Sequence, residues 1–109
     1  LLKYMDQEKV FLPKVSGIKE EVFQQLICLA KEYQIERMIL FGSRARGDFY
    51  TVSDIDLAVS GGDFNRFALD AEECIDTLLK FDIINLNAPM EEELLESINK
   101  DGIIIYEKI

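Results

Sequence analysis

The chain has 109 residues, of which 21 are Asp or Glu and 12 are Lys or Arg, so its formal net charge is −9 at pH 7. This length supports one hydrophobic core, and we expect a single domain over residues 1–109. The acidity argues against nonspecific binding to nucleic acid, and the lack of histidine excludes Ser-His-Asp catalysis, Cys-His catalysis and His-rich zinc sites within this sequence.

No part of the sequence approaches the roughly 18 consecutive apolar residues that a membrane-spanning helix needs, and no signal-peptide pattern opens it. We therefore expect no membrane partner and a cytoplasmic location. Cys28 and Cys74 fall among apolar neighbours in helical patterns. We expect both thiols to be buried as small hydrophobic side chains rather than joined in a disulfide.

In chain order, the first segment is a lead-in over residues 1–16, which we expect to be extended or partly disordered. An amphipathic helix follows from Ile18 to about Ile35, and Ser16 and Gly17 supply its start. Its apolar residues recur at intervals of four, three and four positions and so share one face. These residues are Val22, Leu26, Leu29 and Tyr33.

A buried strand is predicted from Arg37 to Phe41, because its last four residues are all apolar. Gly42 would let the chain leave this strand sharply, since glycine tolerates positive φ and close approach of a ligand. Ser43 could cap a short helix that begins at Arg44, and Gly47 would end that helix. The N-terminus of such a helix presents unpaired N–H groups and a partial positive charge, which favour phosphate.

Two carboxylates, Asp54 and Asp56, follow Ser43 after ten intervening residues, within an alternating segment that predicts a half-buried strand. Residues two apart in a strand point to the same face, about 6.5–7 Å apart. Carboxylates at that separation can share metal ions, and hard oxygen ligands suit Mg²⁺. Two such ions about 3.5–4 Å apart can stabilise both the attacking and the leaving oxygen of a displacement. The pattern therefore indicates a nucleotidyl-transfer site.

The remaining segments supply scaffold. Gly61-Gly62-Asp63 ends the second strand and leads into a helix from about Phe64 to Lys80. A strand over 81–86, a helix whose first turn holds three glutamates over 91–93, and a final strand over 103–106 complete the chain. This alternation also allows a doubly wound parallel sheet. The inner stripe of the helix after Asp63 comprises Phe64, Phe67, Ala71, Cys74, Ile75 and Leu78.

The segment from Gly42 to Asp56 resembles the Gly-Ser-x10-Asp-x-Asp signature of the DNA polymerase β nucleotidyltransferase superfamily. The strings over 41–47 and 53–57 resemble its minimal nucleotidyltransferase branch, and a looser resemblance extends from Ile18 to about Tyr106. The resemblance implies an α+β fold, with a mixed β-sheet and helices packed against it.

The family pattern also implies a third carboxylate on a later strand. Asp82 is the candidate, because residues 81–86 are the only later strand-like segment with an acid near its start. The resemblance then implies that Asp54 and Asp56 hold two Mg²⁺ ions and that Asp82 completes one coordination sphere. The rival acids fall in a helical pattern, and we expect them on the solvent-exposed face of that helix. They are Asp70, Glu72, Glu73 and Asp76.

By the same resemblance, the substrate is ATP, with its phosphates over Gly42 and Ser43. Arg46 is the arginine expected near the triphosphate, and Arg44 is a weaker candidate, because residues two apart on a helix point in different directions.

The resemblance also implies the reaction, which is transfer of AMP from ATP to an acceptor hydroxyl. The acceptor it points to is a tyrosine of a HEPN-type helical toxin, for which this chain would be the antitoxin. Two alternatives stay open. One is an antitoxin that neutralises its partner by binding alone, and the other is a small-molecule enzyme of the antibiotic-modifying kind. A homo-oligomer is the alternative to the HEPN-type partner.

Overall fold

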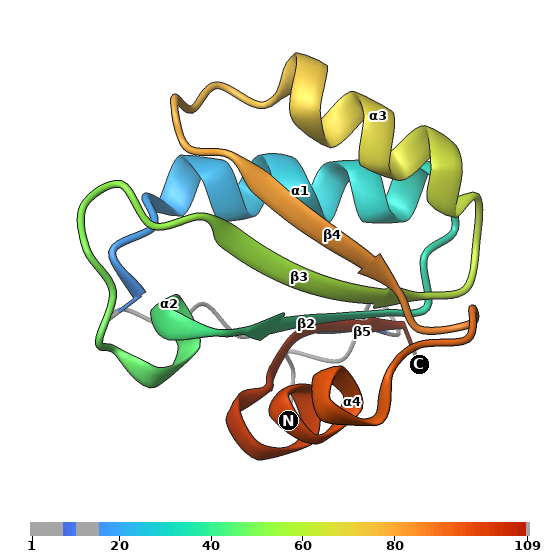
Figure 1. Ribbon diagram of the computed structural model, residues 1–109. Helices are drawn as coiled ribbons and strands as arrows, with labels where there is room; N and C mark the ends of the chain where they lie inside the picture. Colours follow the sequence, from blue (N-terminus) through green and yellow to red (C-terminus); the bar gives the residue numbers. More distant parts are fainter. Residues whose placement is uncertain (1–7, 11–15, 109) are drawn as a thin grey trace.

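A mixed β-sheet lies at the centre of the molecule, with helices on both of its faces (Figure 1). The structure is a computed structural model that describes residues 8–10 and 16–108. The strands are β1 (Glu8–Val10), β2 (Arg37–Phe41), β3 (Ile55–Ser60), β4 (Phe81–Asn85) and β5 (Ile103–Lys108). The helices are α1 (Glu20–Glu32), α2 (Ser43–Arg46), α3 (Phe64–Cys74) and α4 (Glu92–Asp101).

The described strands lie in the order β1-β5-β2-β3-β4. β3 and β4 run parallel, whereas the other three neighbouring pairs are antiparallel. The predicted α+β fold with a mixed sheet is therefore confirmed, and the doubly wound parallel alternative does not hold. Of the predicted lead-in, Glu8–Val10 forms β1, and residues 1–7 and 11–15 lie outside the described part of the chain.

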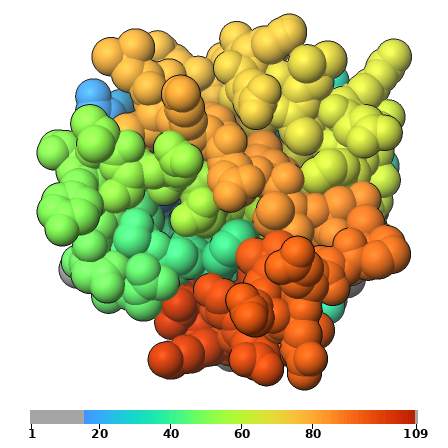
Figure 2. Space-filling view, in the orientation of Figure 1, coloured from blue at the N-terminus to red at the C-terminus, as the bar shows by residue number. Residues whose placement is uncertain are grey.

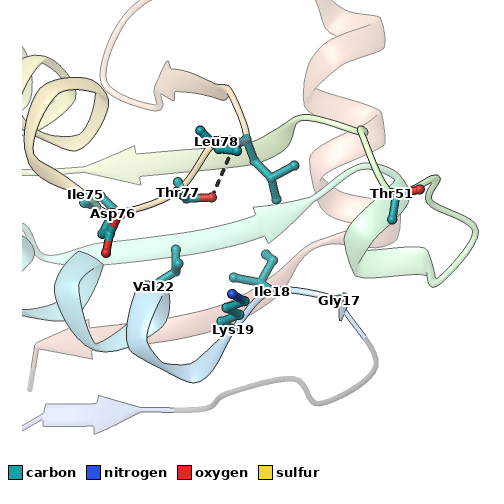
Figure 3. Close-up of a pocket in the computed structure, with 10 residues that line it drawn as sticks. Gly17, Ile18, Lys19, Val22, Thr51, Ile75, Asp76, Thr77 and Leu78 are labelled. Carbon is teal, nitrogen blue, oxygen red and sulfur yellow. Dashed lines mark hydrogen bonds between the residues drawn. The ribbon is translucent and has the colours of Figure 1, made fainter.

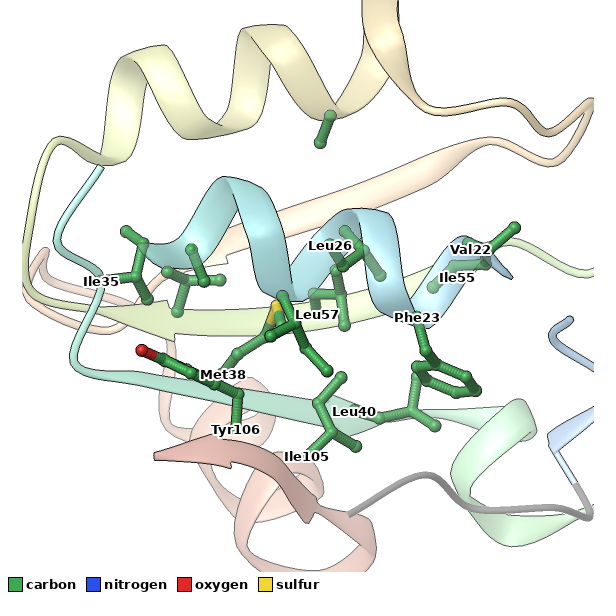
Figure 4. Packing of buried hydrophobic residues seen from close by; sticks show 14 of the residues in the cluster. Val22, Phe23, Leu26, Ile35, Met38, Leu40, Ile55, Leu57, Ile105 and Tyr106 are labelled. Carbon is green, nitrogen blue, oxygen red and sulfur yellow. The ribbon is translucent and has the colours of Figure 1, made fainter. Parts of the chain in front are cut away.

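The helices divide the sheet into two faces. α1 and α3 cover one face, and α4 covers part of the other (Figure 1). The main core lies between the sheet and the α1–α3 pair, where the residues labelled in Figure 4 pack together. Within the described residues, no helix has the length and apolar character needed to cross a bilayer. A smaller cluster lies on the α4 face and consists of Ile39, Phe41, Ala58 and Ile98.

α1 is shorter at both ends than the sequence pattern predicts. It begins at Glu20 with Lys19 as its N-cap, so the prediction that Ser16 and Gly17 supply its start is wrong. The Ser16 hydroxyl instead accepts a hydrogen bond from the Ile18 N–H at 3.3 Å. Beyond the other end, Gln34 has a φ of 61°, a left-handed conformation that a right-handed helix does not accommodate.

α3 ends at Cys74, six residues before the predicted end at Lys80. Ile75 adopts an extended conformation and is buried, and the Asp76 N–H donates to the side-chain oxygen of Gln25 on α1 at 2.9 Å. Leu78, which the pattern places on the inner stripe, is fully exposed in the loop that follows. A contact with α1 therefore replaces the last predicted turns of the helix.

The prediction that Cys28 and Cys74 are buried is wrong, because both are exposed. α1 turns Ile27 and Ala30 toward the core, which leaves Cys28 at the rim of the helix. Cys74 occupies the last position of α3. Both thiols are free, as predicted, and both line an apolar groove of about 300 Å³ between the two helices.

Candidate active site

The backbone places the three predicted carboxylate residues near the start of β3 and β4. The strands are parallel, and their register places Asp56 directly opposite Asp82. Asp54 immediately precedes β3 and lies two residues before Asp56. Side chains alternate along a strand, and Ala58 packs in the cluster on the α4 face. Asp56 therefore faces the same side of the sheet as α4, away from α1 and α3.

Gly42 leaves the space that Asp56 occupies. β2 pairs with β3 so that Phe41 lies opposite Asp56, and Gly42 follows with a φ of 75°. A Cβ atom at Gly42 would lie 2.2 Å from a carboxylate oxygen of Asp56. Any other residue would therefore be strained in its backbone and would push Asp56 aside. The Asp56 side chain therefore keeps its position only because residue 42 has no side chain.

The electrostatics of the site centre on Asp56. Burial first, and then the like charges of Asp82 and Asp54, together raise the pKa of its carboxyl from the ordinary 3.8 to about 6. Arg46 and Arg44 oppose that shift in the pKa. Negative charge concentrated in this way, on a half-buried carboxylate between two others, favours a bound cation.

The donor set fits a divalent metal in its chemistry. Asp54 and Asp82 are exposed and Asp56 is half-buried, so all three present hard oxygen donors on the open end of the sheet. As the side chains stand, no three Asp, Glu or Cys residues in the described part of the chain converge closely enough to hold one ion together. The backbone therefore places the donors on one pair of strands, and their side chains would have to rotate to bind one ion together.

α2 begins one residue earlier than predicted. The helix starts at Ser43, and Gly42 is its N-cap, whose carbonyl accepts from the N–H groups of Ala45 and Arg46 at 3.1 Å each. The prediction that Ser43 caps a helix beginning at Arg44 is therefore wrong. Gly47 ends the helix in a left-handed conformation with φ 93°, as predicted.

The two arginines of α2 have different surroundings. Arg46 is exposed, and its guanidinium donates to Asp101 at 2.9 Å and to Asp48 at 3.2 Å. The hydrogen bond to Asp101, and to a smaller extent the one to Asp48, raises the pKa of Arg46. Because Arg46 also lowers the pKa of Asp56, it lies at the rim of the carboxylate site. Asp101 enters the site from the end of α4, and no local sequence signal marks a pairing across 55 residues.

Arg44 is buried, with 2% of its surface exposed, and its guanidinium donates to backbone carbonyls at Ser53, Ser16 and Thr51. This geometry commits the guanidinium to the loop after α2, and a role for Arg44 in binding the nucleotide stays a prediction that the contacts do not favour. Sequence reasoning misses this environment, because the acceptors are main-chain oxygens that carry no residue-type signal.

The rival acids lie elsewhere. Asp70 on α3 accepts a hydrogen bond from the Tyr33 hydroxyl, which raises the pKa of Tyr33 to about 12. Glu72 and Glu73 are exposed on α3, and Asp76 is exposed in the loop after it. Within residues 8–10 and 16–108, the like charges that act on Asp56 come from Asp82 and Asp54.

The site end of the sheet is open on one side of the molecule. In Figure 2, teal and yellow-green atoms of the segments around Gly42 and β3 show in the middle of the face. Around them lie the green loop after α2, the orange β4 and the red α4. The carboxylates can therefore be reached from solvent between α2, β4 and α4.

Comparison with known proteins identifies the class of this fold. The family described as polymerase beta, nucleotidyltransferase matches residues 24–109. A protein of Methanocaldococcus jannaschii, named as a candidate protein adenylyltransferase, is 35% identical over 91 residues, which span 84% of this chain and 79% of that protein.

Solved structures share the fold. A toxin–antitoxin crystal structure with AMP-PNP superimposes with a TM-score of 0.62 at 22% identity, over 76% of this chain and 71% of that one. A complex of a tri-AMPylated Shewanella oneidensis HEPN toxin with its MNT antitoxin gives 0.56 at 20% identity, over 77% and 68%. A structure named as a candidate minimal nucleotidyltransferase gives 0.57 at 25% identity, over 74% and 86%.

The family match covers most of the chain and includes the Gly42–Ser43 turn and all three carboxylates. The relative in M. jannaschii extends over a similar share of the sequence. This chain therefore belongs to the polymerase beta nucleotidyltransferase family and is a nucleotidyltransferase.

Proposed function

We propose that this protein transfers AMP from ATP, with Mg²⁺, to a tyrosine hydroxyl of a small helical toxin of the HEPN kind, and thereby acts as its antitoxin. The observation that carries the proposal is the register of β3 and β4. It sets Asp56 opposite Asp82, with Asp54 two residues away and Gly42 packed against Asp56. Acids placed in this way beside an open glycine turn suit a triphosphate that arrives with divalent cations.

Each residue has a role in this proposal. Asp54 and Asp56 would hold two Mg²⁺ ions, and Asp82 would complete one coordination sphere and accept the proton of the attacking hydroxyl. The bound ions would supply charge stabilisation for the phosphates. Gly42 and Ser43 would lie under the triphosphate at the start of α2, with Arg46 at its edge.

The chemistry is an in-line displacement. A bond forms between the acceptor oxygen and the α-phosphorus, the bond from that phosphorus to the bridging oxygen breaks, and pyrophosphate leaves. The protein contributes mainly by holding the reacting groups in position and by stabilising charge.

The choice of acceptor is supported by the relatives. The M. jannaschii protein is named for adenylyl transfer to protein, and one structural neighbour is an MNT antitoxin in complex with an AMPylated HEPN toxin. The net charge of −9 adds to this choice, because a chain of this acidity is poorly suited to hold a nucleic-acid acceptor by itself.

The test is a labelling experiment with the purified chain and a small helical protein of the HEPN kind from the same genome. With ATP labelled at the α-phosphate and Mg²⁺, we expect label on a tyrosine of that partner, located by peptide mass spectrometry. The double variant D54N/D56N should lose about two orders of magnitude or more in rate. Its far-ultraviolet circular dichroism should match that of the wild type.

The matched control is Glu73→Gln, which removes one exposed carboxylate from α3 on the opposite face of the sheet. This control should label the partner at the wild-type rate. Absence of label with the wild type, or equal labelling by D54N/D56N, would show that the chain does not catalyse this transfer.

A further inference from the structure

The loop over residues 48–53 joins α2 to Asp54 and has little packing of its own. Two of its large apolar side chains point outward, with Tyr50 79% exposed and Val52 82% exposed. Its tip is a tight turn, in which the Ser53 N–H donates to the Tyr50 carbonyl at 3.0 Å and the Tyr50 N–H donates to the Ser53 hydroxyl at 2.8 Å. Among the large apolar side chains of this loop, only Phe49 is partly buried, where its ring lies against Gly17.

The far side of the loop borders empty space. Thr51 lines a cavity of about 480 Å³, and Figure 3 shows it across that cavity from Thr77 and Leu78. A third side of the cavity is lined by the segment that leads into α1, which includes Gly17 and Lys19. Packing of the loop against that segment is carried by the Phe49 ring beside Gly17, and Thr51 borders the cavity instead.

Arg44 is placed to anchor this loop. Its guanidinium donates from Nε to the Ser53 carbonyl at 3.0 Å, from Nη2 to the Thr51 carbonyl at 3.1 Å, and from Nη1 to the Ser16 carbonyl at 3.0 Å. The guanidinium also stacks on the ring of Phe49, 4.7 Å from its centroid. One side chain thus joins α2, the loop and the segment before α1.

The chemistry of these contacts requires arginine. Burial lowers the pKa of Arg44, and such desolvation is tolerated where the N–H groups meet acceptors. A planar fork with five donors can reach several carbonyls and stack on an aromatic ring at the same time. A lysine at the same position would keep the charge and would lose the fork.

The contact with Ser53 acts directly on Asp54. A carbonyl and the following N–H belong to one planar peptide unit, so the Arg44 bond to Ser53 fixes the peptide that enters Asp54. The peptide that leaves Asp54 is fixed as well, because the Ile55 N–H donates to the Lys80 carbonyl at 2.8 Å. Asp54 therefore lies between two anchored peptides, although its own side chain is exposed.

We infer that Arg44 is a positioning residue, which holds the backbone of residues 48–53 so that Asp54 points to the metal-binding side of β3. This inference rests on the proposed function only in what Asp54 binds, because the anchoring of the loop is independent of catalysis.

The test uses Arg44→Gln and Arg44→Lys in the full chain, with two readouts. The first is amide hydrogen exchange of the loop without nucleotide or partner, where both variants should exchange faster than the wild type at Ser53. The second is the Mg²⁺ concentration that gives half-maximal AMP transfer, which should rise about tenfold or more in both variants. Excess Mg²⁺ should recover part of the rate.

Arg37→Gln is the matched control, because it removes one arginine charge from the opposite end of the sheet. Arg37 is exposed and pairs with Glu107 at 3.9 Å. It should leave both the exchange of the loop and the Mg²⁺ dependence unchanged. Wild-type behaviour of Arg44→Gln, or full recovery by Arg44→Lys, would overturn the inference, because the forked hydrogen bonds would then be dispensable.

If both Arg44 variants fail to fold, Phe49→Leu tests the same anchor with a smaller structural change. It removes the ring under the guanidinium and keeps the arginine itself. Faster loop exchange and a smaller rise in the Mg²⁺ requirement support the inference, and no change in either would overturn it. Should the wild type transfer no AMP at all, the proposed function fails, while the exchange measurement still decides the role of Arg44.

Discussion

At the scale of single residues, Asp56 combines the two properties that a metal-binding carboxylate needs. Its carboxylate lies close against the turn at Gly42, and it lies among like charges that no described side chain fully neutralises. Such an arrangement opposes folding when the ligand is absent. The site therefore trades stability for affinity, which is common where charge is assembled for function.

This trade predicts that Asp56→Asn stabilises the metal-free protein. The pKa of Asp56 is about 6 in the folded chain against an ordinary 3.8, so the folded state holds its proton to a higher pH than the unfolded state does. The wild type then loses stability as the pH rises from about 4 through about 6. Above that range, with a chelator present, the variant should be more stable by about 1 kcal/mol, after solvent screening is allowed for.

Urea unfolding at a series of pH values measures this difference. The advantage of Asp56→Asn should shrink as the pH falls through 6, since the wild-type carboxyl then becomes neutral as well. Glu73→Gln, on the exposed side of α3, should follow the wild type at every pH. A variant that is less stable than the wild type at high pH would show that the carboxylates do not repel one another in the folded state.

The residues of the site differ in how far sequence could identify them. Asp54 and Asp56 carry a pattern of two-residue spacing, and the strand that holds Asp82 is visible in the sequence. The environment of Arg44 was not predictable, because its acceptors are main-chain carbonyls. The pairing of Arg46 with Asp101 depends on how α4 packs, which no local pattern encodes.

At the scale of elements, a boundary is predictable where a residue next to it in sequence sets it, and not where a distant contact does. β2 has the predicted bounds, since its apolar run has a polar neighbour on one side and a glycine on the other. α3 begins where predicted, after Asp63, because an N-cap is a local feature. Its end is set by a contact between Gln25 and the Asp76 N–H, which are far apart in sequence. Tertiary contacts of this kind override the amphipathic pattern that continues to Lys80.

The cap of α3 is testable by itself. The Asp63 carboxylate accepts a hydrogen bond from the Arg66 N–H at 3.3 Å, which satisfies one of the free donors of the first turn. Asp63→Ala should lower the free energy of unfolding by about 0.5–1 kcal/mol, because alanine cannot accept this bond. Asp63→Asn keeps an acceptor and should lie near the wild type. Equal losses in the two variants would assign the effect to charge rather than to the cap.

At the scale of the whole molecule, the net charge of −9 complicates any measurement of metal binding. A divalent cation screens the repulsion among all carboxylates, and screening alone raises the stability of an acidic protein. A specific site adds a second term, because a ligand that binds only the folded state stabilises it by mass action. The two terms separate when ionic strength is held constant and the site carboxylates are changed.

The final prediction uses that separation. At matched ionic strength, Mg²⁺ at about ten times its dissociation constant should stabilise the wild type by about 1.4 kcal/mol, which corresponds to a rise in Tm of about 5 °C or more. D54N/D56N should gain almost nothing from Mg²⁺, since it lacks the donors. Removal of two like charges should nevertheless make this variant the more stable protein in chelator. As Mg²⁺ is added, the difference between the two Tm values should therefore shrink, or the wild type should become the more stable protein. An equal rise in both proteins would mean that Mg²⁺ acts on the charge of the whole molecule, and the three carboxylates would then hold no ion in the absence of nucleotide.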